Sequence, residues 1–340
     1  MCDIGQEDGS QTPRAEGFEV SGSSFGLMLK TFAGDAVYVE RLVESFNQFN
    51  VEGLSLWIVA PDSDLPGFRH FASEFIQLVS DEDIPVRYLN EDSADLSLVD
   101  PRPGRAPFGF LNQGISKLAF FKLGLLDNYV CLDSDTEFIR PFGRSDFMAD
   151  DTTPWFFAQD YSDLAADPFY RPRYWLEREK CLDRVRERLG VEKVPRVTVH
   201  NSLVMSSAVL EDFENIFLLR EGLDFSDLMQ MCTLEFFWYG TWMQRQQLVP
   251  LLQRGDLIRM VNHQGEHLSL YASGARKRDL AEGYLGVIVN SNWSRQYGVV
   301  DFDRPPVAEY FRQGDWAEWM AVNQLDSLWC TSGFGSSSLS

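Results

Sequence analysis

Residues that build disulfide frameworks and metal centres are scarce in this chain. Its five cysteines are scattered over 340 residues, no two of them form a CxxC pair, and there are only four histidines. An odd number of isolated cysteines argues against a disulfide framework and against a structural zinc site. We therefore expect neither, and we interpret Cys131, which lies inside an apolar run, as a small core residue.

The chain also lacks an uninterrupted apolar run long enough to cross a membrane. Its first twenty residues are polar and acidic, without the basic start and apolar middle of a signal peptide. The composition predicts a disordered leader over residues 1–24 and a flexible tail over residues 326–340. The expectation is a cytoplasmic protein without a membrane span.

Positive charge is also scarce. The chain has 30 Lys and Arg residues and 51 Asp and Glu residues, which give a net charge of −21. Such a surface repels phosphate backbones and anionic lipid, so we expect neither nucleic acid nor membranes as partners. Solubility alone, or a salt-rich habitat, would explain the same acidity.

Strand-like and helix-like segments alternate through the first half of the chain. Apolar runs at 25–32, 54–60 and 84–89 predict strands, and the spacing of apolar residues at 35–50 and 65–78 predicts helices between them. A further helix is expected at 112–126, ahead of the next strand. This order is typical of a mostly parallel sheet flanked by helices, which binds ligands at the carboxyl ends of its strands. We therefore expect Lys30, Thr31, Phe32 and Asp62 near a ligand.

The apolar run Tyr129–Leu132 ends abruptly on Asp133 and Asp135, and Glu137 follows at the same spacing. Residues i and i+2 of an extended chain point the same way, so both aspartates can face one point beyond the strand. Paired carboxylates suit Mg²⁺ or Mn²⁺, which bind a few carboxylates together with substrate phosphates. The chemistry that such a metal serves is departure of a diphosphate.

The segment "KLGLLDNYVCLDSDTEFIRPF" at 122–142 resembles the DxD region of nucleotide-sugar-dependent glycosyltransferases of the GT-A fold. It is most similar to a bacterial group of glycosyltransferase-like proteins. The resemblance extends from about Phe25 to Val300, with weaker matches in "HNSLVMSSAVL", "EFFWYG" and "GVIVNSN". It implies a single GT-A (Rossmann-like) domain, with a nucleotide-sugar-binding half at 25–150 and an acceptor-binding half at 151–325.

The resemblance also implies a metal ion, Mn²⁺ or Mg²⁺, held by Asp133 and Asp135. GT-A enzymes often take a third ligand from a late histidine, and His267 is our choice for it. Donor contacts are further expected from Ser134 and from Gln113 and Lys117, which lie four residues apart and share one helix face. The expected acceptor contacts are His200, Asn201, Trp238, Tyr239, Asn290 and Asn292.

Glu235 is a lone carboxylate within an aromatic segment, and burial there would raise its pKa and suit a general base. The alternative is a buried structural acid, bonded to Tyr239 or to the backbone. Asp160, which follows another aromatic cluster, is the second catalytic candidate.

Three functions fit these features. The first is a metal-dependent glycosyltransferase that moves a sugar from a nucleotide-sugar to a saccharide or small-molecule acceptor. The second is a catalytically silent sugar-nucleotide-binding or assembly protein of the same fold. The third, a nucleotidyltransferase, would need a Gly-rich basic loop near the first strand, which "LKTFAGDAVY" does not supply.

Overall fold

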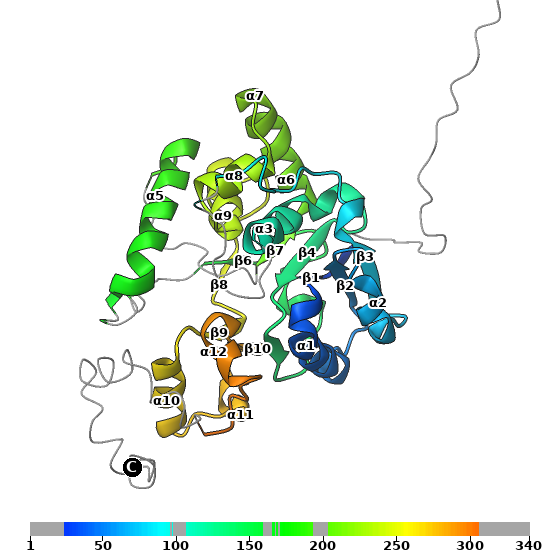
Figure 1. The fold of residues 1–340 in the computed structure, drawn as a ribbon, viewed down its shortest axis with the longest axis vertical. Coiled ribbons are helices and arrows are strands. Elements are labelled where there is room, and N and C mark those ends of the chain that lie inside the picture. The colour runs from blue at the N-terminus through cyan, green and yellow to red at the C-terminus, as the bar shows by residue number, and fades with distance from the viewer. Residues whose placement is uncertain are drawn as a thin grey trace, which may run out of the picture.

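A five-stranded sheet forms the centre of the molecule (Figure 1). The computed structural model describes residues 24–95, 97, 107–158, 165–166, 168, 171–192 and 203–305. The strand order is β3-β2-β1-β4-β7, and β7 runs antiparallel to β4 whereas the other neighbours are parallel. The expected mixed, mostly parallel sheet is thus confirmed. Its strands are β1 (Phe25–Lys30), β2 (Ser55–Ala60), β3 (Ile76–Ser80), β4 (Asn128–Leu132) and β7 (Val204–Ser206).

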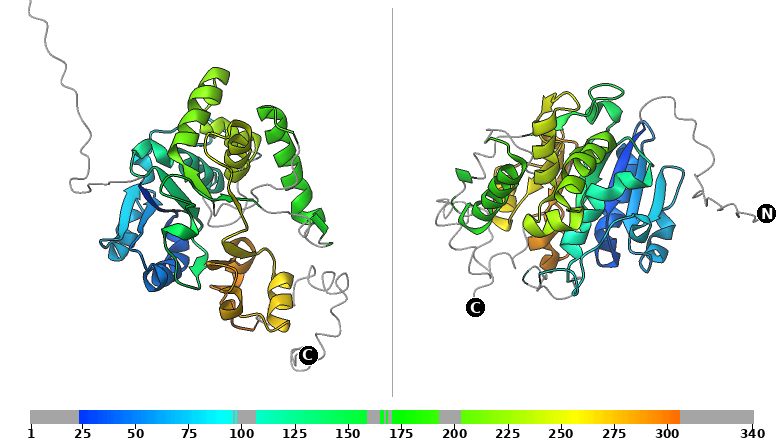
Figure 2. Two further views of the ribbon diagram at one scale, coloured as in Figure 1. Left: turned by 180° about the vertical axis from the view of Figure 1, so that it is seen from behind. Right: turned by 90° about the horizontal axis from the view of Figure 1, so that it is seen from above.

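Helices cover both faces of this sheet, because strand side chains alternate between the faces. Leu27 and Leu29 pack with α1 (Ala36–Phe49), on the side that also carries the short α2 (Leu65–Phe68). Met28 and Cys131 face the opposite core. That core also contains α3 (Gly109–Ala119), α5 (Leu176–Leu189), α6 (Ser207–Asp212), α8 (Phe225–Met231) and α9 (Glu235–Gln246). Figure 2 shows this layering from two further directions.

A smaller sheet lies beside the carboxyl end of β4. It has the order β5-β10-β9, built from β5 (Thr136–Phe138), β10 (Gly286–Val289) and β9 (Ile258–Val261). The helices α10 (Gln264–Ala272), α11 (Lys277–Leu280) and α12 (Ser291–Ser294) belong to this part. Because β5 follows β4 directly, Asp133 and Asp135 lie where the chain passes from the large sheet to the small one.

The remaining elements are short. A two-stranded sheet pairs β6 (Phe156–Phe157) with β8 (Gln253–Arg254), and α7 (Leu219–Glu221) follows α6. Among the helices that the structure describes, none combines the length and hydrophobicity that crossing a membrane requires. The expected leader lies outside the described residues except for Ser24, and the expected tail lies wholly outside them.

The predictions for the segment 65–89 were wrong. The predicted helix at 65–78 is only α2 and a single 3₁₀ turn at Arg69–Phe71, after which Ile76–Ser80 forms β3. The predicted strand at 84–89 joins no sheet. Pro85 lacks the N–H that a ladder needs, whereas Ile76 and Val79 have the β-branched side chains that strands favour.

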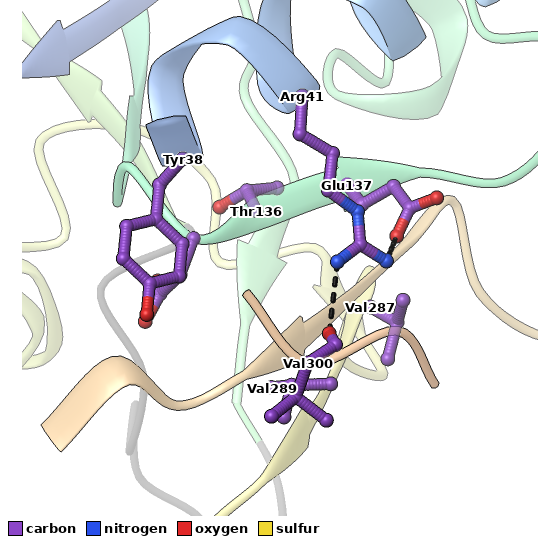
Figure 3. A pocket seen from close by; sticks show the side chains of 8 residues that line it. Tyr38, Arg41, Thr136, Glu137, Val287, Val289 and Val300 are labelled. Atoms are coloured by element: carbon purple, nitrogen blue, oxygen red, sulfur yellow. Dashed lines mark hydrogen bonds and ion pairs between the residues drawn. The ribbon is translucent and has the colours of Figure 1, made fainter. Parts of the chain in front are cut away.

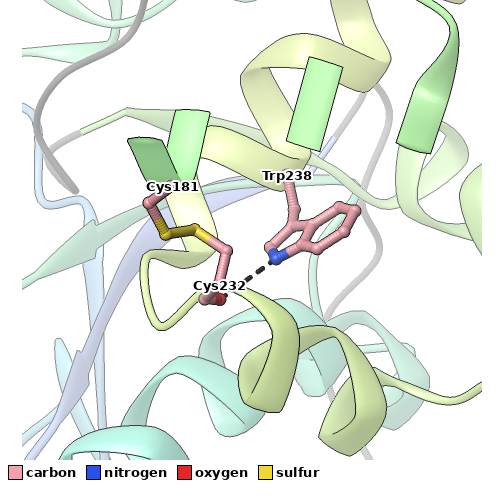
Figure 4. The surroundings of a disulfide bond; sticks show 3 residues. All are labelled: Cys181, Cys232 and Trp238. Carbon is pink, nitrogen blue, oxygen red and sulfur yellow. Dashed lines mark hydrogen bonds between the residues drawn. A yellow bond between two sulfur atoms is a disulfide. The ribbon is translucent and has the colours of Figure 1, made fainter. Parts of the chain in front are cut away.

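A disulfide joins Cys181 of α5 to Cys232 at the end of α8, which corrects the expectation that the cysteines form no such bond (Figure 4). The two Cα atoms are 5.4 Å apart, and the bond spans 51 residues of sequence. The indole Nε1 of Trp238 donates to the Cys232 carbonyl oxygen at 3.1 Å. Cys131 is a buried free thiol, as expected. Disulfides persist more readily in oxidising compartments, and the cytoplasmic location stays a prediction.

Replacing both cysteines, as Cys181→Ser with Cys232→Ser, should lower the free energy of unfolding by about 4 kcal/mol, because the bond closes a loop of this length. Urea unfolding of the oxidised wild type and the double variant measures the difference. Alkylation without reductant, followed by peptide mass spectrometry, should label Cys131 in the unfolded wild type but neither Cys181 nor Cys232. Equal stabilities, or alkylated Cys181 and Cys232, would contradict the expectation.

Candidate active site

An open cleft of about 870 Å³, counted with the solvent at its mouth, lies at the carboxyl end of β4. One wall comes from α3 and α9, and the other comes from the end of β10 and the start of α12. Of the residues expected from sequence to bind a ligand or to catalyse, eight line this cleft: Gln113, Lys117, Asp133, Ser134, Asp135, Glu235, Asn290 and Asn292. The structure therefore brings the strand-end aspartates and the candidate base into one cavity.

Two side chains of α3 hold Asp133. Lys117 donates from its Nζ to Asp133 Oδ1 at 2.8 Å, and Gln113 donates from Nε2 to the same oxygen at 3.2 Å. The predicted common face of Gln113 and Lys117 is therefore present, and it points at the carboxylate. Both residues act on the protein's own aspartate in this arrangement.

Lys117 also binds Glu235. Its Nζ lies 3.0 Å from Glu235 Oε1, and Lys117 and Glu235 are only 2% and 4% exposed. Burial by itself lowers the pKa of Lys117, but the charges of Asp133 and Glu235 raise it above its ordinary value. The acid that looked isolated in the sequence therefore has a charged partner, Lys117, which is neither of the two partners, Tyr239 and the backbone, named in the structural alternative.

Gly114 packs closely against the neighbouring helices. A Cβ at that position would meet the flexible end of the Met229 side chain of α8 and would lie 3.5 Å from the Glu235 Cβ. The missing side chain leaves α3 in close contact with α8 and α9 beside the ion pair.

Asp135 is held from the side of the smaller sheet. The backbone N–H of Ser291, at the start of α12, donates to Asp135 Oδ2 at 2.7 Å. Burial, and after it the charge of Asp133, raises the pKa of the Asp135 carboxyl to about 7. Ser134, between the two aspartates, donates its hydroxyl to Thr31 Oγ1 at 3.0 Å and so ties this turn to the end of β1.

Glu137, the third carboxylate of the row, has a structural role. It accepts from Arg41 of α1 (Figure 3) and from Lys277 of α11, the latter at 2.6 Å. Arg41 also donates to the Val300 carbonyl oxygen at 2.8 Å. Arg41, Glu137 and Asp135 all line a small hollow, and these bonds fasten the smaller sheet to α1.

The other donor candidates lie outside the cleft lining. Lys30 is buried and lies 2.9 Å from Asp81 Oδ2, and burial lowers its pKa. Thr31 is buried beneath Ser134, Phe32 is half-buried over Gly34, and Asp62 is exposed beyond the end of β2. Lys30 therefore neutralises Asp81 at the strand ends.

The acceptor candidates divide into three groups. Trp238 and Tyr239 are core residues, since the Trp238 indole is bonded to Cys232 and the Tyr239 hydroxyl accepts the Ser206 N–H at 2.7 Å. Asn290 caps α12, where its side chain accepts the Asn292 N–H at 2.9 Å at the cleft edge. The acceptor candidates His200 and Asn201 lie outside the described residues, as does the second catalytic candidate, Asp160.

His267 is not brought to the aspartates. It is buried against Trp293 and Phe302, and its Nε2 lies 3.2 Å from the Phe302 carbonyl oxygen. Burial lowers its pKa, so the ring is neutral at pH 7. Within the described part of the chain, no three His, Cys, Asp or Glu side chains are grouped as metal ligands.

Sequence reasoning missed several residues of the cleft. Asp35 lines it just after β1 and is paired with Arg295, and Phe110 lines it while 44% exposed. Arg178 lines it from α5, a helix whose exposed residues carry charges of both signs. The sequence carried only weak signals for these three residues. A single side chain in a loop after a strand, or on a charged helix, does not reveal from the sequence whether it faces a cleft or solvent.

Comparison with known proteins gives little beyond this geometry. No protein-family model matches the chain, and no curated protein sequence matches it significantly. Among solved structures, mouse xyloside xylosyltransferase 1 in its apo form is similar, with a TM-score of 0.42 and 10% sequence identity. The match covers 79% of this chain and 98% of that chain. A likeness of this size does not by itself establish a shared activity.

The raised pKa of Asp135 should make stability pH-dependent. In the unfolded chain this carboxyl loses its proton near pH 4, whereas in the folded protein it keeps the proton up to about pH 7. Raising the pH between these values therefore favours unfolding. Relative to wild type in EDTA, Asp135→Asn should become more stable by roughly 4 kcal/mol as pH rises from 4 to 8. Urea unfolding at each pH measures this, and a constant difference would contradict it.

Proposed function

We propose that this protein is a glycosyltransferase that moves a sugar from a nucleotide-diphospho-sugar to a saccharide or small-molecule acceptor. The observation that carries the proposal is the pair Asp133 and Asp135 at the carboxyl end of a central parallel strand. Both line one cleft with the buried carboxylate of Glu235. Parallel sheets bind ligands at that edge. The GT-A resemblance of the segment around this pair supports the same reading.

The residues present fit a divalent cation. Asp133 and Asp135 supply two hard oxygen ligands to one cleft, and Mg²⁺ or Mn²⁺ takes its remaining ligands from water and substrate phosphates. This agrees with the lack of a third protein ligand near them in the described residues. When bound there, the ion would neutralise the charge that builds up on the leaving diphosphate.

The surrounding side chains orient these ligands. Lys117 and Gln113 fix Asp133 through one oxygen, and the Ser291 N–H fixes Asp135 through one oxygen. Because the holding groups come from α3 and from α12, each carboxylate has its own support. The two aspartates therefore keep their positions when a ligand enters, which is what a preformed site requires.

Glu235 is our candidate for the residue that takes the proton from the acceptor hydroxyl. Its ion pair with Lys117 fixes the carboxylate on the cleft wall. Proton removal by a positioned carboxylate needs a fixed geometry first, and the pair provides it. Lys117 is the positioning residue, because it reaches Asp133 and Glu235 at the same time.

Metal-dependent donor binding tests the proposal. We expect a panel of UDP, GDP, CMP and dTDP sugars to raise the melting temperature of wild type in the presence of Mn²⁺, because a ligand that binds only the folded state stabilises it. Asp133→Asn and Asp135→Asn should stay folded and lose this shift. Asp83→Asn, an exposed aspartate after β3, is the matched control and should keep it. Mn²⁺-dependent shifts in both cleft variants would disprove the metal site.

Loss of turnover in Glu235→Gln separates a transferase from a silent binder. The substitution keeps the size of the side chain but removes its capacity to take a proton, so transfer should fall about 10²–10⁴-fold. Donor affinity should be unchanged, and the fold should persist because Lys117 keeps Asp133. Glu214→Gln, which breaks an ion pair with Lys122 away from the cleft, controls for the lost pair. Full activity in Glu235→Gln would remove Glu235 from the mechanism.

A further inference from the structure

Acidic groups outnumber basic ones around the cleft. Its described lining carries the carboxylates of Asp35, Asp133, Asp135 and Glu235, but only two cations, Lys117 and Arg178. Nucleoside diphosphates and acidic saccharides are anions, so the cleft must offset charge to admit them. The position of each cation decides which of them meets a ligand.

The two cations differ in accessibility. Lys117 is 2% exposed and enclosed between Asp133 and Glu235, where it serves the protein's own carboxylates. Arg178 is half-buried in the first turn of α5 and lines the cleft together with Glu235 of α9. Its guanidinium has five N–H donors in a rigid fork, so it can bind two oxygens of a ligand while keeping other contacts.

Arg178 also has a fixed position. The disulfide partner Cys181 is one helical turn further along α5, and Cys232 lies three residues before Glu235. Leu182 and Val185 bury the same helix against the core. The wall that carries Arg178 is thus covalently linked to the wall that carries Glu235, which gives this arginine the rigid support that a recognition residue needs.

Other arginines of α5 serve different purposes. Arg186 is buried and pairs with Asp183, and Arg188 pairs with Glu221 while lying over the Phe217 ring. Arg184 is exposed and does not line the cleft. Helix α5 therefore presents Arg178 to the cleft and Arg184 to solvent.

We propose that Arg178 is the anion-recognition residue of the cleft and binds phosphate or carboxylate oxygens of the substrate through its guanidinium fork. The inference deepens the proposed glycosyl transfer and rests on it for the identity of the substrate. The oxyanion belongs either to the donor's diphosphate or to an acidic group on the acceptor. Phosphate and carboxylate groups each present two oxygens that the arginine fork can bind in bidentate fashion.

Binding of small probes to the full chain tests this. Wild type, Arg178→Gln, Arg178→Lys and Arg184→Gln are titrated calorimetrically with inorganic pyrophosphate, uridine diphosphate, glucuronate and glucose, with Mn²⁺ present. We expect Arg178→Gln to weaken at least one oxyanion probe about 10- to 100-fold, the size of a charged hydrogen-bond contribution. Arg178→Lys should weaken it less, and Arg184→Gln should bind as wild type does.

The pattern of loss identifies the source of the oxyanion. Weakened pyrophosphate and uridine diphosphate support the proposal and assign Arg178 to the donor, whereas weakened glucuronate with unchanged glucose supports it and assigns Arg178 to the acceptor. If Arg178→Gln binds every oxyanion as Arg184→Gln does, or if wild type binds none, the proposal is overturned. Should Arg178→Gln fail to fold, Arg178→Lys is judged by the same comparison.

Turnover of the nucleotide-sugar panel, measured on the same proteins, separates the two proposals. Arg178-dependent oxyanion binding without any transfer would overturn the glycosyltransferase assignment and leave this inference intact. Transfer by wild type, with oxyanion affinities that do not depend on Arg178, would support the glycosyltransferase assignment and overturn this inference.

Discussion

The buried ammonium of Lys117 connects the elements on which the cleft depends. Lys117 belongs to α3, and its two carboxylate partners come from two other elements: Asp133 from the end of β4 and Glu235 from the start of α9. Charges removed from water need partners, and a buried carboxylate without one is costly. The positions of Asp133 and Glu235 are therefore coupled, because the same cation must reach both.

A second constraint acts along the row of alternating carboxylates after β4. Asp133 is held by α3, Asp135 by the Ser291 N–H of α12, and Glu137 by Arg41 and Lys277. The spacing of two residues, which aligns the side chains on an extended chain, is used here to join two sheets. Only the first two face the open cleft, and the third fastens α1 to α11. The same two-residue spacing therefore serves two roles: Asp133 and Asp135 face the cleft, whereas Glu137 holds two helices together.

The helix α5, beside α9, is secured by a covalent bond. The Cys181–Cys232 disulfide ties α5 to the turn that precedes α9, and the buried face of α5 adds apolar contacts to the same core. Without these attachments, a helix with so many charged residues would have little to hold it in one orientation. Its mixed charges reflect three separate uses: ion pairs on the surface, solvation, and one guanidinium at the cleft.

Local patterns in the sequence were enough to predict β1, α1, β2 and β4 and the mostly parallel sheet. The period of the hydrophobic residues and the ends of strands depend only on residues that are neighbours in the sequence. They also predicted that Asp133 and Asp135 end a buried strand, and that Gln113 and Lys117 share a face. They failed at 65–89, where short apolar groups fit helix and strand alike. The Lys117–Glu235 pair spans 118 residues and the disulfide spans 51, so no spacing rule could find either. Which face of α5 meets the cleft, and which acid receives the lysine, was decided only by tertiary packing, because burial and charge pairing depend on the neighbours that the fold brings together.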